Sequence, residues 1–433
     1  MASTGHREDG EEREDKKRKT EKNSKNSKEM KRKKREKKRE DEKRKREEDN
    51  ESGSKEMKRK KREKKREDEK RKREEDNESG SKEMKKRRGE KARVLEDEEP
   101  RAGSSQDPGA PSPYPKLNIT RFTIHQVLGR GGFGVVVLAS VPRRNTYTAI
   151  KIINKRGDNA AILMRERRIL LVARDCPFLC HLYAAHQTQE RAYFVTEYLS
   201  GGSLEDLIDL CGYLNINNVR FYTAEIVCGL QFLHGHNIVH RDIKPDNIML
   251  DKDGHIRIID LGLAQDGVTF SSKTSGVTGT DVYMAPEVIA GLEYYTAVDW
   301  WSLGIVVSRM SSGCSPFYYG SISEEVCKSI TTAKADIPSW LDADVQHLLK
   351  KLLRKNPERR LGVYKNIRDH PFFNTIVWED LEERRAQPPC VPFRAALENQ
   401  HLLWPEDTTP LHPVAGFSYM SPSLARMVKR SKL

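Results

Sequence analysis

The chain has 433 residues, of which 33% are charged, and its formal net charge is +14. Its seven cysteines are scattered without a C-x-x-C pair, which argues against a zinc module or a disulfide framework. No apolar run reaches the roughly 18 residues of a membrane span and no apolar signal core begins the chain, so we expect an intracellular protein without a membrane span.

The first part of the chain is too polar to fold around a core. Residues 1–100 contain 41 of the 79 Lys and Arg residues, 31 of the 65 Asp and Glu residues, and no Phe, Trp, Tyr or Cys. Residues 28–54 recur without change at 55–81. We therefore predict a disordered charged tail over 1–101. A linker rich in Pro, Ser and Gly follows over 102–121.

A polyanion, either a nucleic acid or an acidic protein, is the partner that such a basic tail could bind. Interspersed acids and the lack of aromatic side chains weaken this alternative, because they lower the local potential and leave nothing to stack on bases. Steep salt dependence of polyanion binding by residues 1–100 would support it, and a flat salt response would contradict it.

The folded part begins with strand patterns and continues with helix patterns. Apolar and β-branched residues predict strands within 122–140, 147–153 and 193–198. Helical spacing predicts helices over 160–173, 219–234 and 298–310. We therefore expect an α+β fold with two lobes, a small β-rich lobe followed by a larger α-helical lobe.

A glycine-rich hairpin is the first candidate site. The pattern G-x-G-x-x-G-x-V lets a backbone approach phosphates closely, because glycine has no side chain to block them. A dinucleotide-binding turn shares these glycines but should open a helix, whereas 135–139 reads as a strand. The candidate nucleotide-binding residues are Leu128, Gly129, Arg130, Gly131, Gly132, Phe133, Gly134, Val135 and Val136.

Lys151 lies on the strand that follows, in a largely apolar run. It could be a surface lysine that extends its ammonium group into water. The functional interpretation is a cation that binds the α- and β-phosphates of a nucleotide. Glu166 is the best candidate for the helix carboxylate that holds it.

Two further motifs carry catalytic residue types. In HRDIKPDN at 240–247, Asp242 would accept the proton of a substrate hydroxyl, Lys244 would lie beside the transferred phosphoryl group, and Asn247 would bind a metal ion. Asp260, in Asp-Leu-Gly, would hold Mg²⁺ between phosphates. This set suits phosphoryl transfer, which needs positioning and neutralisation of phosphate charge.

In this order and spacing, the motifs resemble a eukaryotic serine/threonine protein kinase over 122–373. YFVTEYLSGG at 193–202, LDKDGHI at 250–256 and IRDHPFF at 367–373 are similar to the AGC group, and most of all to novel-type protein kinase C. The resemblance implies an N-lobe at 122–198, a C-lobe at 199–373 and a C-terminal tail at 374–433. It also implies a monomer that uses ATP and Mg²⁺ to phosphorylate Ser and Thr hydroxyls of protein substrates in intracellular signalling.

The resemblance assigns further roles. Glu197 and Leu199 would lie beside the nucleotide, with Thr196 at the rear of its site. Asp299 would brace the catalytic loop, and Arg360 would pair with Glu287. An apolar column linking the two lobes would contain Leu170, Leu182, His240 and Leu261.

Three departures from the family concern substrates and activation. Gly276 stands at the usual activation-segment phosphosite, which leaves Ser275 as a candidate beside it. Ser203 and Arg309 replace two acids that bind basic substrates in relatives, although Asp246 keeps one acid nearby. We expect Arg309 to repel a basic peptide residue and to weaken the preference for basic substrates.

The C-terminal tail and the missing modules complete the expectations. Ser418, in VAGFSY at 414–419, would be the phosphoacceptor of a hydrophobic motif that folds back on the small lobe, and Val414 should weaken its docking. Thr409 is a second candidate phosphosite. The lipid-binding modules of protein kinase C are absent, so we expect no control by diacylglycerol.

Two alternatives concern activity and location. A scaffold with a degenerate kinase domain would lose part of the set Lys151, Glu166, Asp242, Asn247 and Asp260, and its intactness favours the enzyme. The terminal Ser431-Lys432-Leu433 matches a peroxisomal address. We weigh it below a cytoplasmic or nuclear location.

Overall fold

The computed structural model describes residues 117–132, 134–141, 146–155, 159–317, 323–389, 414 and 416–425. The chain divides at Gly109 into two units, and all described residues belong to the second unit. Several predictions therefore lie outside the described residues. They concern the charged tail with its repeats, the linker up to residue 116, Phe133, Thr409 and Ser431-Lys432-Leu433.

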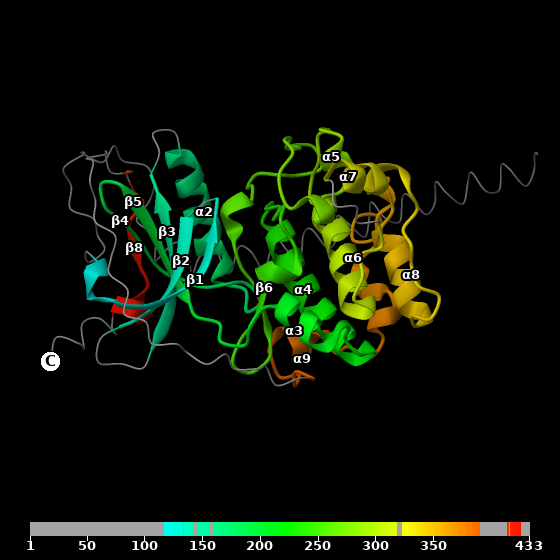
Figure 1. The fold of residues 1–433 in the computed structure, drawn as a ribbon, viewed down its shortest axis with the longest axis horizontal. Helices are drawn as coiled ribbons and strands as arrows, with labels where there is room; N and C mark the ends of the chain where they lie inside the picture. The colour runs from blue at the N-terminus through cyan, green and yellow to red at the C-terminus, as the bar shows by residue number, and fades with distance from the viewer. Residues whose placement is uncertain are drawn as a thin grey trace, which may run out of the picture. The chain divides into compact units, whose positions relative to one another are not determined.

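A six-stranded antiparallel sheet forms the first part of the fold (Figure 1). The spatial order of its strands is β1-β2-β3-β5-β4-β8. The pairs β1/β2, β2/β3 and β4/β5 are neighbours along the chain, whereas β3 pairs with β5. The last strand comes from the C-terminal end and pairs with β4. The strands are β1 (Thr123–Gly131), β2 (Gly134–Ser140), β3 (Tyr147–Asn154), β4 (Leu182–Gln187), β5 (Arg191–Glu197) and β8 (Tyr419–Met420).

Helices dominate the second part, as the pattern of strands first and helices later predicted. A small two-stranded sheet of β6 (Ile248–Leu250) and β7 (Ile256–Ile258) lies among them. The helices are α2 (Ala160–Ala173), α3 (Leu204–Cys211), α4 (Ile216–Gly235), α5 (Pro286–Ile289), α6 (Ala297–Ser312), α7 (Ser323–Thr332), α8 (Ala343–Leu352) and α9 (Trp378–Glu382). Helix α2 packs against strand β4 of the large sheet (Figure 1). The other helices come after β5 in the chain.

Two hydrophobic clusters hold these elements together. The larger one includes most of α4 and α6, which are buried on nearly all sides, and it continues to the inner side of the large sheet. Leu170, Leu182 and Leu261 belong to this cluster, and His240 is fully buried. The smaller cluster joins β1–β3 to the residues at both ends of the described chain, such as Leu117 and Leu424. The expected α+β two-lobed architecture is confirmed.

The C-terminal segment folds back onto the large sheet. Phe417 is fully buried against Phe194 of β5, with ring centroids 5.2 Å apart. The side chain of Gln187 makes two hydrogen bonds with the backbone of Val414, of 2.6 and 2.7 Å. These bonds use main-chain atoms, so valine retains them in place of the usual phenylalanine. The half-buried Ser418 lies between Phe417 and β8.

The six cysteines within the described residues are free, and burial raises the pKa of the Cys180 thiol to about 12. In the part of the chain that the structure describes, no helix is both long and apolar enough to cross a bilayer.

Candidate active site

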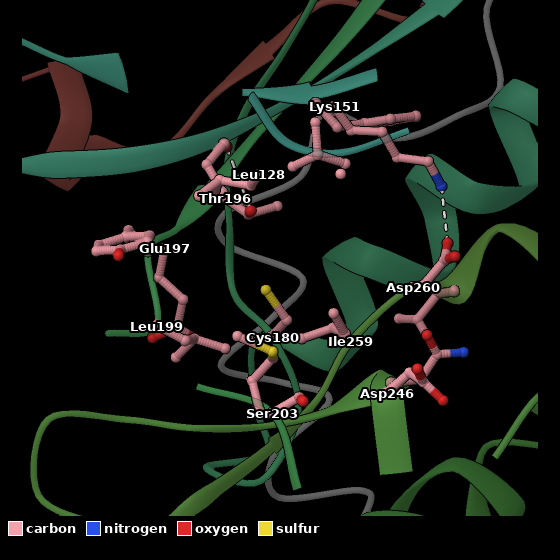
Figure 2. A pocket seen from close by; sticks show the side chains of 18 of the residues that line it. Leu128, Lys151, Cys180, Thr196, Glu197, Leu199, Ser203, Asp246, Ile259 and Asp260 are labelled. Carbon is pink, nitrogen blue, oxygen red and sulfur yellow. Dashed lines mark hydrogen bonds and ion pairs between the residues drawn. The ribbon is translucent and has the colours of Figure 1, made fainter. Parts of the chain in front are cut away.

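A cavity of about 580 Å³ lies between the large sheet and the helical part (Figure 2). Figure 2 shows Leu128, Thr196 and Leu199 at one side of this cavity, and Lys151 and Asp260 at the other. The cavity therefore has a mostly apolar end and a charged end. The lining residues predicted from the sequence are Leu128, Gly129, Val136, Lys151, Glu166, Thr196, Glu197, Leu199, Asn247 and Asp260.

Some predicted residues do not line the cavity. The hairpin positions outside the lining are Arg130, Gly131, Gly132, Gly134 and Val135, and the catalytic-loop positions outside it are Asp242 and Lys244. Ala149, Cys180, Met249 and Ile259 line the cavity without having been predicted. Sequence reasoning missed these apolar residues because they look like ordinary core residues.

The glycine hairpin joins β1 to β2, where Gly131 pairs with Gly134. Gly134 has a φ of +140°, and a Cβ there would lie 2.0 Å from the Ile152 carbonyl oxygen, so only glycine fits. At Gly129, Gly131 and Gly132, a Cβ would meet nothing within 4 Å. A side chain at these three positions would therefore contact no atom of the described residues.

Lys151 is held between two carboxylates at the charged end. Its Nζ atom lies 2.7 Å from Glu166 Oε1 and 2.8 Å from Asp260 Oδ1. Burial alone would lower the pKa of Lys151, but the two carboxylates outweigh this effect and raise it. Burial raises the pKa of Glu166, although the ammonium group opposes this shift. The sequence-predicted partner of Lys151 is therefore in place, and the lysine remains a cation.

Asp242 is buried at the centre of a hydrogen-bond network. Its Oδ2 atom accepts a hydrogen bond of 2.9 Å from the Asn247 amide and lies 3.1 Å from Lys244 Nζ. Its Oδ1 atom accepts a hydrogen bond of 2.8 Å from the Thr280 hydroxyl, which itself accepts one from Lys244. The carboxylate is thereby fixed in position, with a cation beside it.

Thr280 is a site residue that sequence reasoning missed. It follows Gly279 in the segment between Asp260 and Glu287. A Cβ at Gly279 would lie 2.5 Å from the Arg241 carbonyl oxygen, so this glycine lets the segment approach the catalytic loop. The Gly-Thr dipeptide was the available signal, but it did not indicate what the hydroxyl contacts.

Two buried ion networks brace the site. The fully buried Asp299 accepts hydrogen bonds from the backbone amides of His240 and Arg241, of 2.9 and 3.0 Å. Burial opposes ionisation of Asp299, but these partners and His234 outweigh it and lower its pKa. Arg360 donates two hydrogen bonds to Glu287, of 2.7 and 3.0 Å. These contacts match the bracing roles that the sequence resemblance implied.

Oxygen atoms for a divalent cation lie beside Lys151. The amide nitrogen of Asn247 is held by Asp242, which leaves the Asn247 amide oxygen without a hydrogen bond among the described residues. Asp260 adopts a left-handed backbone conformation with a φ of +54° and uses Oδ1 for Lys151 and the Gly262 amide. Within the described part of the chain, its Oδ2 atom has no hydrogen-bond partner. Hard cations such as Mg²⁺ prefer oxygen ligands, so this pair fits one.

A carboxylate lies beside Ser203, although Ser203 itself replaces an acid of the relatives. Asp206 Oδ2 accepts hydrogen bonds of 2.7 Å from both the amide and the hydroxyl of Ser203, forming the capping box that begins α3. Both residues line the cavity, as does Asp246. A carboxylate is therefore present beside Ser203 although the residue itself is neutral.

Arg309 is not an isolated cation. It forms ion pairs with Glu205 and with Asp209, the second at 3.6 Å. Two acids of α3 therefore share its charge, and the predicted repulsion of basic peptides rests on a charge that is largely compensated.

The chain is similar in sequence to known protein kinases. The protein kinase domain family matches residues 122–373, more than half of the chain. Human protein kinase C delta type is 38% identical over 337 residues, which is 72% of this chain and 49% of the relative. The rat delta type is 42% identical over 281 residues, with 64% and 42% covered. Rabbit (Oryctolagus cuniculus) protein kinase C epsilon type is 36% identical over 314 residues, with 68% and 42% covered. The chain thus matches half or less of the length of these relatives.

Proposed function

The chain belongs to the protein kinase family, and from this premise we propose that it is a Mg²⁺-dependent serine/threonine kinase that transfers the γ-phosphoryl group of ATP to protein substrates. One observation carries the proposal. Lys151, held by Glu166 and Asp260, lies at the charged end of the cavity, and the catalytic loop supplies Asp242 with its own set of donors. Both halves of a phosphoryl-transfer site are intact.

Each residue has a role that its contacts support. Lys151 binds phosphate oxygens and balances their charge when the nucleotide is bound. Asp242 orients the acceptor hydroxyl and accepts its proton, because its carboxylate is fixed by three donors. Lys244 neutralises negative charge beside it. ATP supplies the phosphoryl group, and Asn247 and Asp260 would hold Mg²⁺.

The apolar end of the cavity suits a flat heteroaromatic ring. Leu128, Val136, Ala149 and Leu199 line it, and the volume of about 580 Å³ lies in the range of small-ligand sites. Gly129 of the hairpin lines the same cavity as Lys151 and Asp260, where the phosphates would lie. The cavity therefore offers a ring site and a phosphate site in one continuous volume.

A scaffold that binds nucleotide without catalysis is the competing function. A phosphorylation assay separates the two: the full chain is incubated with ATP and Mg²⁺ and a peptide library with Ser, Thr or Tyr acceptors. We expect labelled Ser and Thr peptides, unlabelled Tyr peptides and no labelling when Mg²⁺ is chelated. Nucleotide binding without labelling of any peptide would support the scaffold and refute the kinase.

We expect substitution of Arg309 to change the choice of substrate. Arg309→Glu removes the cation that compensates Glu205 and Asp209 and adds a third carboxylate. The preference for peptides with Arg upstream of the acceptor should rise roughly fivefold on a peptide array, from one added Coulomb contact of about 1 kcal/mol. The melting temperature should fall, because like charges are then adjacent.

Arg309→Met is the matched control for this prediction, since it removes the cation without adding a negative charge. Its preference for basic peptides should lie between those of the wild type and Arg309→Glu. Equal peptide profiles for all three proteins would show that position 309 does not affect selection.

A further inference from the structure

We propose that the hydroxyl of Tyr294 is the positioning group that holds the activation segment, residues 260–287, in its working arrangement without a phosphate on Thr274 or Ser275. The inference rests on the proposed kinase function and concerns how that activity is regulated. It begins from the tyrosine itself, which is 2% exposed and lies just beyond the segment. Its contacts reach both the activation segment and the catalytic loop.

Tyr294 binds the activation segment through both its backbone and its side chain. Its backbone pairs with Thr274 in an isolated antiparallel bridge, with hydrogen bonds of 2.8 and 2.9 Å. Its hydroxyl donates a hydrogen bond of 3.0 Å to the Gly276 carbonyl oxygen. Three hydrogen bonds therefore fix residues 274–276, where the sequence resemblance would place a phosphosite.

The same hydroxyl also reaches the catalytic loop. Arg241 Nη1 lies 3.4 Å from Tyr294 Oη, and Arg241 Nε donates a hydrogen bond of 2.6 Å to the Leu263 carbonyl oxygen. The Arg241 backbone has a φ of +71° and is anchored on Asp299. One guanidinium thus joins the catalytic loop, the start of the segment and Tyr294, using neutral oxygens in place of a phosphate.

Gly276 fits this arrangement because of its backbone. Its φ is +102°, a conformation that residues with a side chain rarely adopt, while a Cβ there would meet no steric obstacle. The backbone path that directs its carbonyl toward Tyr294 therefore favours glycine. A threonine or serine at this position would be strained, which accounts for the missing hydroxyl at the usual phosphosite.

The hydrogen bond from Tyr294 to Gly276, which we call the tether, lies close along the chain to the reacting groups. Thr280, whose hydroxyl is bonded to Asp242, follows Gly276 by four residues, and Gly279 between them packs against the Arg241 backbone. Loosening the segment at Gly276 should displace Thr280 and with it the Asp242 carboxylate. The nucleotide cavity should be unaffected, because Tyr294 and Gly276 do not line it.

The neighbouring Tyr295 provides a matched control. It is also buried, but its hydroxyl has no hydrogen-bond partner among the described residues. Its ring packs edge-on against Phe270, and phenylalanine would preserve that contact. Comparing Tyr294→Phe with Tyr295→Phe therefore isolates the tethering hydroxyl from the general loss of a buried phenol.

The experiment uses the full chain, its two Tyr→Phe variants and the double variant Thr274→Ala/Ser275→Ala. Loss of one hydrogen bond should lower kcat of Tyr294→Phe about threefold to tenfold toward a Ser peptide library, with an unchanged KM for ATP. Amides 274–280 should also exchange with deuterium about threefold to tenfold faster in this variant. Tyr295→Phe and the double variant should match the wild type in both measurements.

Several outcomes would overturn the inference. Equal exchange of amides 274–280 in the two Tyr→Phe variants would show that the hydroxyl does not hold the segment, whether or not the protein is active. Equal kcat values for these variants would show that the tether does not affect catalysis. A double variant with kcat reduced about tenfold or more would show that a phosphate is required. A wild-type protein without phosphoryl transfer would refute the proposed function separately, since exchange does not depend on activity.

Discussion

Lys151→Met should lower kcat about 100- to 1000-fold, the cost of removing one preorganised electrostatic group from a transition state. Methionine has a similar length but no charge, so phosphate oxygens lose their cation. The variant also leaves Glu166 buried without its ion pair, and burial already raises the pKa of that carboxyl. Glu166 should then take up a proton, which lets the fold survive. Steady-state phosphorylation of a Ser peptide library measures kcat, and circular dichroism verifies folding.

Lys252→Met is the control for loss of a lysine. Lys252 is exposed, forms an ion pair with Asp253 at the surface and lies outside the cavity lining, so its replacement should leave kcat unchanged. A Lys151→Met protein that is folded and turns over at the wild-type rate would refute the role assigned to Lys151. If Lys151→Met instead destabilised the fold, the variant would have a lower melting temperature than the wild type.

The sequence predicted the residues whose roles follow from local motifs. Lys151, Asp242 and Asp260 lie in short motifs with fixed spacing, and the strand predicted over 147–153 contains Lys151. Asp299 and Arg360 were predicted from the family resemblance, because their contacts at 2.7–3.0 Å join segments that are distant in the chain. No rule based on spacing alone would have paired them.

Side-chain contacts between distant segments explain what could not be predicted. Arg309 looked like a free cation because its partners, Glu205 and Asp209, lie about 100 residues earlier on α3. Asp206 supplies a carboxylate at Ser203 only because a helix begins there and the capping box turns its side chain back. In both cases the sequence shows which residues are charged, but the fold decides which of these charges lie close together.

Docking of the C-terminal segment illustrates the same limit. Replacement of the first phenylalanine of the motif by Val414 suggested weak docking, since an apolar contact is lost. In the structure the segment is held by hydrogen bonds to the backbone of Val414, which do not depend on its side chain, and by the pairing of β8 with β4. Hydrogen bonds to backbone atoms do not depend on the side chain, so the amino-acid sequence does not indicate them.

Asp242→Asn should separate catalysis from nucleotide binding more cleanly than any change at Lys151. The carboxylate accepts from Asn247, Thr280 and Lys244, and an amide would turn a donor toward at least one of these donors. It also removes the proton acceptor for the substrate hydroxyl. We expect kcat to fall about 100- to 10,000-fold, the range for loss of a general base.

Nucleotide affinity should remain within about twofold, since a change below 0.5 kcal/mol is expected for a residue outside the cavity lining. Titration with a fluorescent ATP analogue measures this affinity, and rapid-quench kinetics measure the transfer step. Asp253→Asn, at an exposed position paired with Lys252, is the control and should retain full kcat. An Asp242→Asn protein with normal turnover would mean that proton acceptance is not needed at this carboxylate. Weak ATP binding by that variant would instead mean that Asp242 supports the nucleotide site, because its network with Asn247 reaches the oxygen atoms that fit Mg²⁺.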